Sequence, residues 1–262
     1  MAEDESNAQV APVAKDAPAE PAPEAPVCPH CAKPDFLCVC DSVEPVANRV
    51  SLLILQHPQE QDRLLGTARL AQRALKNAQL TIGLSWPSLS KILGRDADPA
   101  QWAVLHLGAG HSKDFPPDRE LVVLDKKGAP APDQDRALAG VRGVVIFDGS
   151  WAQAKTLWWR NPWVLKAKRL ALNPKRASLY GNLRREPRRE ALSTIEAAGL
   201  ALSRLERKPE IEAALLKDFA AMLGKYRAAV ASGALAAPPA PPRRGRPPRR
   251  GPSTKKSAPP SA

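Results

Sequence analysis

One short stretch of the sequence indicates the fold class. Residues 143–155 read GVVIFDGSWAQAK, an apolar run that ends at Asp148 and Gly149. Ser150 and Gln153 then fit the S-x-x-Q pattern that begins many helices. The stretch therefore predicts a buried strand, a tight turn and a helix in immediate succession.

The same alternation of strands and helices extends over the central part of the chain. Apolar runs predict strands at residues 50–56, 79–83, 103–107, 121–125, 144–147 and 169–172. Amphipathic segments predict helices at residues 67–76, 151–159, 194–206 and 209–230. This order predicts an α/β fold with a mainly parallel sheet flanked by helices. Ligands in such folds bind beyond the carboxyl ends of the strands, so we expect the site in the loops after Gln56, Leu107, Leu124 and Phe147.

The two ends of the chain differ from its centre in composition and charge. Residues 1–26 are rich in Ala, Pro and Glu with a net charge of −5, and residues 236–262 are rich in Pro and Arg with a net charge of +7. Both ends are predicted to be disordered, because neither has enough apolar side chains to offset the entropy of ordering. The whole chain carries a net charge of +12, which leaves +10 for a single domain at residues 27–235. A basic domain favours a polyanionic partner such as nucleic acid, although solubility alone is an alternative explanation.

No segment of the chain has the composition of a membrane span or a secretory leader. No apolar run approaches the roughly 20 residues that a span needs, and the N-terminus lacks an apolar h-region. We therefore expect a cytoplasmic protein without a membrane partner. The basic tail predicts salt-sensitive phosphate contacts, with a solvated tail that has no binding role as the alternative.

Four cysteines near the start of the chain indicate a metal site. Cys28, Cys31, Cys38 and Cys40 follow the pattern C-x2-C-x6-C-x-C within 13 residues. Disulfides are disfavoured in a reducing compartment, and four close thiols match the tetrahedral coordination of zinc. Because all four ligands come from the protein, we expect a structural zinc knuckle that orders a segment without a core of its own.

Three loops concentrate polar side chains. HPQEQDR at residues 57–63 follows one predicted strand, DGSW at 148–151 follows another, and STIEA at 193–197 opens a late helix. Capping boxes account for Ser150 with Gln153 and for Ser193 with Glu196. Capping does not account for Asp148 at the end of its strand, or for Trp151 beside it.

Taken together, these motifs resemble those of the DTW-domain family, the tRNA-uridine aminocarboxypropyltransferases. The resemblance covers about residues 28–226 and consists of the cysteine cluster, QHPQE at 56–60, TARL at 67–70, Tyr180 with Arg184 and Arg185, DGSW at 148–151 and STIEA at 193–197. The name-giving motif of the family reads D-x-T-W, whereas this chain has D-G-S-W. Since serine keeps the hydroxyl group, we expect the role of that position to survive.

The resemblance implies a reaction and a set of site residues. The 3-amino-3-carboxypropyl group of S-adenosylmethionine is transferred to N3 of a uridine in tRNA, with U47 the expected position, and methylthioadenosine leaves. A knotted, methyltransferase-like fold is also implied. A base is needed to remove the N3 proton, and Asp148 is the first candidate. The further catalytic candidates are Trp151, Glu60 and Glu196. The candidates for binding S-adenosylmethionine are His57, Gly108, Gly149, Ser150, Ser193 and Thr194. The candidates for binding RNA are Arg63, Arg184 and Arg185.

Two other functions fit the same sequence. A methyltransferase that uses S-adenosylmethionine on RNA would release S-adenosylhomocysteine instead of methylthioadenosine. A non-catalytic RNA-binding module, built on the zinc knuckle and the basic tail, would bind tRNA whether or not Asp148 is present.

Overall fold

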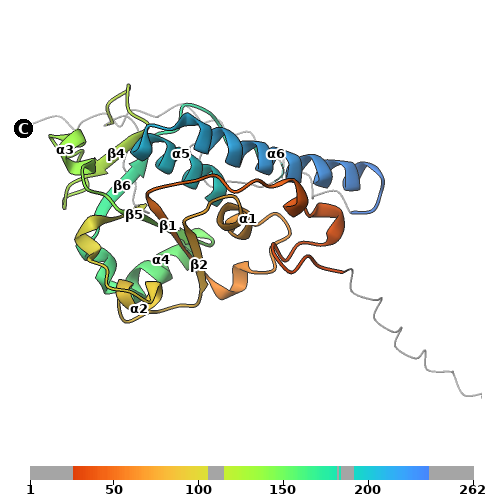
Figure 1. Cartoon of the computed structure of the whole chain (residues 1–262), viewed down its shortest axis with the longest axis horizontal. Helices are drawn as coiled ribbons and strands as arrows, with labels where there is room; N and C mark the ends of the chain where they lie inside the picture. Colours follow the sequence, from red (N-terminus) through yellow and green to blue (C-terminus); the bar gives the residue numbers. More distant parts are fainter. Residues whose placement is uncertain (1–25, 106–114, 182, 184–191, 236–262) are drawn as a thin grey trace, which may run out of the picture.

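The computed structural model describes residues 26–105, 115–181, 183 and 192–235. These residues form a six-stranded sheet with helices on both faces (Figure 1). The strands are β1 (Ser51–Gln56), β2 (Ala78–Ile82), β3 (Trp102–Leu105), β4 (Leu121–Leu124), β5 (Gly143–Asp148) and β6 (Lys168–Leu172). The predicted α/β class with a mainly parallel sheet is confirmed, whereas the expected knot stays a prediction.

The order of the strands places β1 and β5 at the centre of the sheet. The order is β2-β1-β5-β3-β6-β4, and all neighbouring pairs are parallel except β4 with β6. The expectation of a ligand site after Leu124 is therefore wrong. Leu124 pairs with Arg169 near the start of β6, so the loop after β4 leaves from the opposite edge of the sheet.

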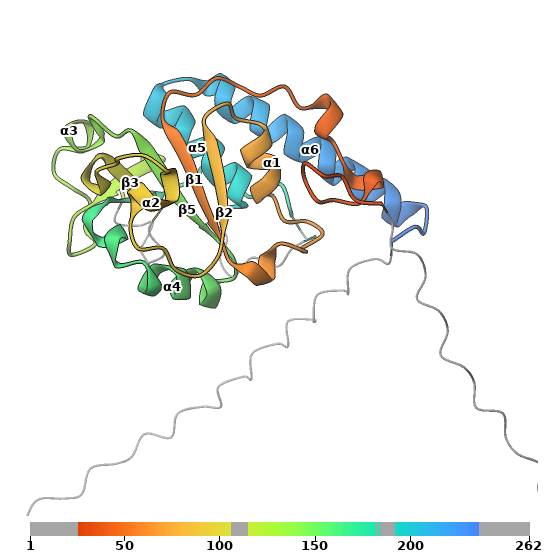
Figure 2. The same cartoon turned by 60° about the horizontal axis from the view of Figure 1, so that its bottom comes forward.

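The helices cover the sheet in two layers, because the strands are apolar on both faces. The helices are α1 (Ala68–Arg73), α2 (Leu89–Leu93), α3 (Gln134–Leu138), α4 (Trp151–Arg160), α5 (Thr194–Glu206) and α6 (Pro209–Ala231). Leu52 and Ile54 of β1 join the core under α1, α5 and α6, while Leu53 and Leu55 join the core under α2 and α4. Figure 2 shows α1, α5 and α6 on one side of the strands and α4 on the other.

The long helices and α1 were predicted from the sequence, although α1 is shorter than the predicted 67–76, whereas α2 and α3 were not predicted. The bounds of α5 agree with the predicted 194–206, and α4 and α6 extend one residue beyond their predicted ends. α2 and α3 have five residues each, too few for a helical period to appear in the sequence. The predicted disordered ends lie outside the described residues, except for Pro26.

The cysteine-containing segment packs against the far end of the longest helix. Its 3-10 helix η1 (Asp35–Leu37) contacts α6, and the Lys225 ammonium of α6 donates a hydrogen bond to the Cys38 carbonyl oxygen. Leu37 is buried in this contact region. None of the helices in the described part of the chain is long and apolar enough to cross a membrane.

Candidate active site

The candidate active site is built around Asp148, the last residue of β5. Asp148 lies opposite Gln56 at the carboxyl edge of the sheet, and its side chain is buried, with 9% of the residue exposed. The Gln56 Nε2 donates a hydrogen bond to Asp148 Oδ2 at 2.8 Å, and the Thr194 hydroxyl donates one to Asp148 Oδ1. Two donors from different elements therefore hold the carboxylate in one orientation.

The start of α5 is docked on the start of α1 next to this carboxylate. Thr194 is the first residue of α5, and the backbone N–H of Ile195 donates to the Thr67 hydroxyl at 3.2 Å. Thr67 immediately precedes α1. The strand end of Asp148 and the two helix starts thus meet at one point, although they are more than 40 residues apart in the sequence.

The turn after Asp148 requires a glycine for steric reasons. A Cβ atom at Gly149 would lie 2.9 Å from the Cβ of Gln153 and 3.5 Å from the Cβ of His57. Ser150 caps α4, and Gln153 completes the capping box by accepting from the Ser150 backbone N–H at 2.6 Å. Gln153 Nε2 also donates to Gln59 Oε1 at 3.2 Å, which joins the start of α4 to the loop after β1.

That loop is ordered by a short 3-10 helix, η3 (Pro58–Glu60). The His57 backbone N–H donates to the Asp148 carbonyl oxygen at 2.9 Å, and His57 Nδ1 accepts from the Gln59 N–H at 3.2 Å. The Glu60 side chain is buried and forms an ion pair with Arg63 at 3.6 Å. The Arg63 side chain is 63% exposed, so its charge faces solvent at the rim of the site.

Glu196 lies deeper than the other candidates. The residue is fully buried, and its carboxylate accepts from the Ser193 N–H at 2.9 Å, the Ser193 hydroxyl at 2.6 Å and the Ser178 hydroxyl at 2.7 Å. The Leu179 N–H donates to its other oxygen at 2.8 Å, and Arg176 lies 3.6 Å away. Both oxygens of this carboxylate therefore accept from protein donors, and the hydrogen bonds from Ser178 and Leu179 hold the segment before α5 against the helix.

The structure brings most of the predicted site residues to one edge of the sheet. The loops with His57, Asp148 and Thr194 are joined by direct hydrogen bonds. Trp151, in the first turn of α4, is half-buried. Gly108, Arg184 and Arg185 lie outside the described residues.

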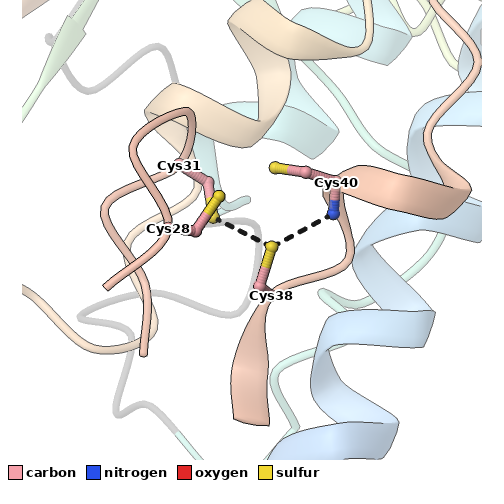
Figure 3. A group of neighbouring side chains, drawn as sticks. All are labelled: Cys28, Cys31, Cys38 and Cys40. Carbon is pink, nitrogen blue, oxygen red and sulfur yellow. Dashed lines mark hydrogen bonds between the residues drawn. The ribbon is translucent and has the colours of Figure 1, made fainter. Parts of the chain in front are cut away.

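The four cysteines face one another in a geometry that fits a metal ion. Cys28 and Cys31 come from one loop, and Cys38 and Cys40 approach from the other side (Figure 3). All four sulfur atoms lie within 4.8 Å of one another, and Cys31 Sγ is 3.8 Å from Cys38 Sγ. Tetrahedral zinc with Zn–S bonds of about 2.3 Å places its sulfur ligands about 3.8 Å apart. The cluster therefore has the ligand set and the spacing of a four-cysteine metal centre.

The thiols of this cluster differ in their acidity. The backbone N–H of Cys31 is the main cause that lowers the pKa of Cys28 to about 7, whereas burial raises the pKa of Cys31 to about 11. Burial also raises the pKa of Cys40. Since metal ions bind the thiolate, metal binding would have to displace protons from the buried thiols.

Comparison with known proteins identifies the family. The sequence profile of the DTW domain matches residues 25–227. The chain belongs to the DTW-domain family. The resemblance seen in the sequence motifs is thereby confirmed, and the matched range contains both the cysteine cluster and the Asp148 site.

The DTW domain of this chain is similar to three curated proteins. A Macaca fascicularis protein named tRNA-uridine aminocarboxypropyltransferase 2 is 28% identical over 201 residues, which are 73% of this chain and 60% of the relative. A Drosophila melanogaster protein of the same name is 29% identical over 193 residues, 71% of this chain and 69% of the relative. The chain thus spans about 60% of the length of the mammalian relatives that it matches. No solved structure is significantly similar to it.

Two residues of the DTW domain near the site were not predicted from the sequence. Lys33, between two of the cysteines, is buried, and its ammonium donates to the Arg63 carbonyl oxygen at 2.5 Å. Arg69, in the TARL motif of α1, has a buried Nε without a hydrogen-bond partner among the described residues. Arg69 belongs to the TARL motif of the family, although the motif alone assigns it no role. No sequence pattern distinguishes Lys33 from a solvent-exposed lysine.

Proposed function

We propose that this protein transfers the 3-amino-3-carboxypropyl group of S-adenosylmethionine to N3 of a uridine in tRNA, with U47 the expected position. The family and the printed names of its relatives support the reaction class. The observation that carries the proposal is the fixed Asp148 carboxylate at the carboxyl edge of the sheet, between Gln56 and Thr194. In α/β folds this edge is where substrates bind.

In the proposed reaction Asp148 removes the proton from N3 of the uridine. The N3 lone pair then attacks the γ carbon of the methionine moiety, and the bond between this carbon and the sulfonium sulfur breaks. The sulfur keeps the electron pair of that bond and leaves as neutral methylthioadenosine, while the proton stays on the Asp148 carboxylate. A general base in hydrogen-bond contact with the nucleophile typically contributes about 10²- to 10⁴-fold to the rate.

The neighbouring residues position Asp148 and the two substrates. Gln56 and Thr194 orient the carboxylate, and the buried Glu196 holds the start of α5 from which Thr194 projects. We assign Glu196 this anchoring role in place of catalysis, because its oxygens are occupied by protein donors. Glu60 pairs with Arg63 at the rim of the site, and we assign RNA contact to the exposed Arg63 side chain.

The remaining predicted residues keep their proposed roles. We assign S-adenosylmethionine to the surface formed by His57, Gly149, Ser150, Ser193 and Thr194, and a uracil or packing contact to Trp151. Gly108, Arg184 and Arg185 stay predictions for binding S-adenosylmethionine and RNA. Four-cysteine coordination of zinc would keep residues 28–40 folded, and elemental analysis of the purified protein tests for that metal.

One incubation tests the proposal. Purified protein, unmodified tRNA and S-adenosylmethionine are combined, and the nucleosides and the released adenosine compound are identified by mass spectrometry. A uridine that gains the aminocarboxypropyl group, with release of methylthioadenosine, supports the proposal. A methyl gain with S-adenosylhomocysteine would establish a methyltransferase, and an unchanged tRNA that still binds would establish a binding module.

The base is tested with Asp148→Asn and a matched control. Asp148→Asn should lower the rate of product formation about 10²-fold or more, with tRNA affinity unchanged, because the amide cannot accept the N3 proton. Asp96→Asn, at an exposed position after α2, should leave the rate unchanged. A rate for Asp148→Asn within a factor of two of the wild type would remove Asp148 from the mechanism.

A further inference from the structure

A buried lysine links the cysteine cluster to the candidate active site. Lys33 lies two residues after Cys31, and only 6% of it is exposed. Its Nζ donates to the Arg63 carbonyl oxygen, which is its one hydrogen-bond acceptor among the described residues. An ammonium group has three donors, so a lysine buried with a single acceptor has capacity for further partners.

The surroundings of this ammonium place it next to the Asp148 site. A Cβ atom at Gly66, one residue before Thr67, would lie 3.7 Å from Lys33 Nζ. Thr67 in turn holds the N–H of Ile195, whose neighbour Thr194 contacts Asp148. Arg69 lies two residues after Thr67, in the first turn of α1. Lys33 and Arg69 therefore both lie beside the start of α1, which is docked on the start of α5 next to Asp148.

Two polar atoms in this region are buried without a hydrogen-bond partner in the described part of the chain. They are Nε of Arg69 and Oε1 of Gln56, and only 3% of Gln56 is exposed. Burying a polar group without a hydrogen bond costs about 1–3 kcal/mol, so such groups are uncommon in proteins unless a ligand or water completes them. The region therefore offers two cationic donors and one acceptor.

Among the residues that the structure describes, positive groups outnumber negative ones in this region. Lys33 and Arg69 bring two positive charges to the start of α1, whereas both oxygens of the nearby Asp148 carboxylate already accept from Gln56 and Thr194. Arg63 does not join this pair of cations, since its side chain is exposed and paired with Glu60. A small oxyanion would supply the missing negative charge, and the burial of Lys33 favours the carboxylate of a small molecule over a phosphate of a polynucleotide backbone.

We propose that Lys33 and Arg69 bind the α-carboxylate of the aminocarboxypropyl donor, and that Gln56 Oε1 accepts from its α-ammonium. The assignment rests on the proposed function, and it names the residues that recognise the amino-acid end of S-adenosylmethionine. If the assignment is correct, a metal ion bound by the four cysteines would also contribute to substrate binding. The Lys33 carbonyl oxygen accepts from the Cys28 N–H at 2.8 Å, and Ala32 has a left-handed φ of 52°. Metal coordination would hold this unfavourable turn, and with it the Lys33 side chain, in place.

The test compares S-adenosylmethionine with its analogue that lacks the α-carboxylate and keeps the amine. Dissociation constants are measured by equilibrium dialysis on the metal-loaded full chain without tRNA. The wild type should bind S-adenosylmethionine about 10- to 100-fold more tightly than the analogue, as expected for charge-assisted hydrogen bonds. Lys33→Met and Arg69→Met should each bring the two dissociation constants to within about threefold of each other. The affinity for the analogue should stay unchanged.

Three further variants separate the assigned roles. Gln56→Met should weaken both compounds equally and leave their ratio unchanged, because both carry the amine. Lys33→Arg should keep most of the discrimination, and the exposed Lys91→Met should change neither affinity. If Lys33→Met does not fold, as judged by circular dichroism, Arg69→Met carries the test.

The outcomes distinguish this inference from the proposed function. A wild type that binds both compounds with equal affinity overturns the carboxylate site and leaves the transferase reaction intact. A wild type that binds neither compound overturns both. If Lys33→Met weakens tRNA and not S-adenosylmethionine, the oxyanion belongs to the RNA and the inference is wrong.

Discussion

The helices α4 and α5 begin with related capping patterns, S-x-x-Q and S-x-x-E, but their N-termini differ in burial and in the number of hydrogen bonds. Ser150 and Gln153 cap α4 at the surface, where Ser150 is exposed. Ser193 and Glu196 cap α5 in the interior, where both residues are buried. Each pair forms a complete capping box.

The difference between the two boxes lies in what surrounds them. Gln153 makes one further bond, to Gln59, whereas Glu196 also binds the Ser178 hydroxyl, the Leu179 N–H and the Arg176 guanidinium. The box of α5 therefore joins a distant segment to the helix, and the box of α4 mainly ends its own helix. A local sequence pattern predicts where a helix starts, but the contribution of the capping box to the stability of the protein depends on its tertiary contacts.

The largest effect is expected for Glu196→Ala. Removing this carboxylate leaves several buried donors and a guanidinium without their acceptor, which should lower the free energy of unfolding by about 3–5 kcal/mol. Gln153→Ala, the matched change in the exposed box, should cost about 0.5–1 kcal/mol. Urea unfolding followed by circular dichroism measures both values, and equal losses would show that burial does not distinguish the boxes.

A smaller contrast is expected for the two capping serines. Ser193→Ala should lower the free energy of unfolding by about 2 kcal/mol, since a buried hydroxyl that donates to Glu196 is lost together with the cap. Ser150→Ala should cost about 0.5–1 kcal/mol, because water replaces the exposed hydroxyl. Urea unfolding measures both changes. A larger loss of unfolding free energy for Ser150→Ala than for Ser193→Ala would contradict the comparison.

The smallest effect is expected for Gln153→Glu, which gives the exposed box the S-x-x-E sequence of the buried one. The added charge favours a helix N-terminus, but the hydrogen bond from Gln153 Nε2 to Gln59 is lost. The free energy of unfolding should change by less than about 0.5 kcal/mol. A stabilisation of more than about 2 kcal/mol in urea unfolding would mean that the sequence pattern, and not its surroundings, sets the strength of the box.

Much of the fold was predictable because its strands are apolar and its long helices are amphipathic. The runs that became β1 and β5 stand out between polar loops, and the helix start at Ser193 has a complete capping signature. The antiparallel direction of β4 was not predictable, since a strand buried on both faces reads the same in either direction. The short α2 and α3 were missed for lack of a full period.

The sequence by itself determined the α/β class, the position of Asp148 at a strand end, the two helix caps and a cluster of four thiols. These features depend on residues close together in the chain, so their spacing is enough to predict them. Only the tertiary structure decided that Thr194 contacts Asp148, that Glu196 is buried, and that Lys33 donates from the cysteine-containing segment to the Arg63 carbonyl oxygen. Such contacts join residues tens of positions apart, and they depend on how the helices and the cysteine loop pack at the edge of the sheet.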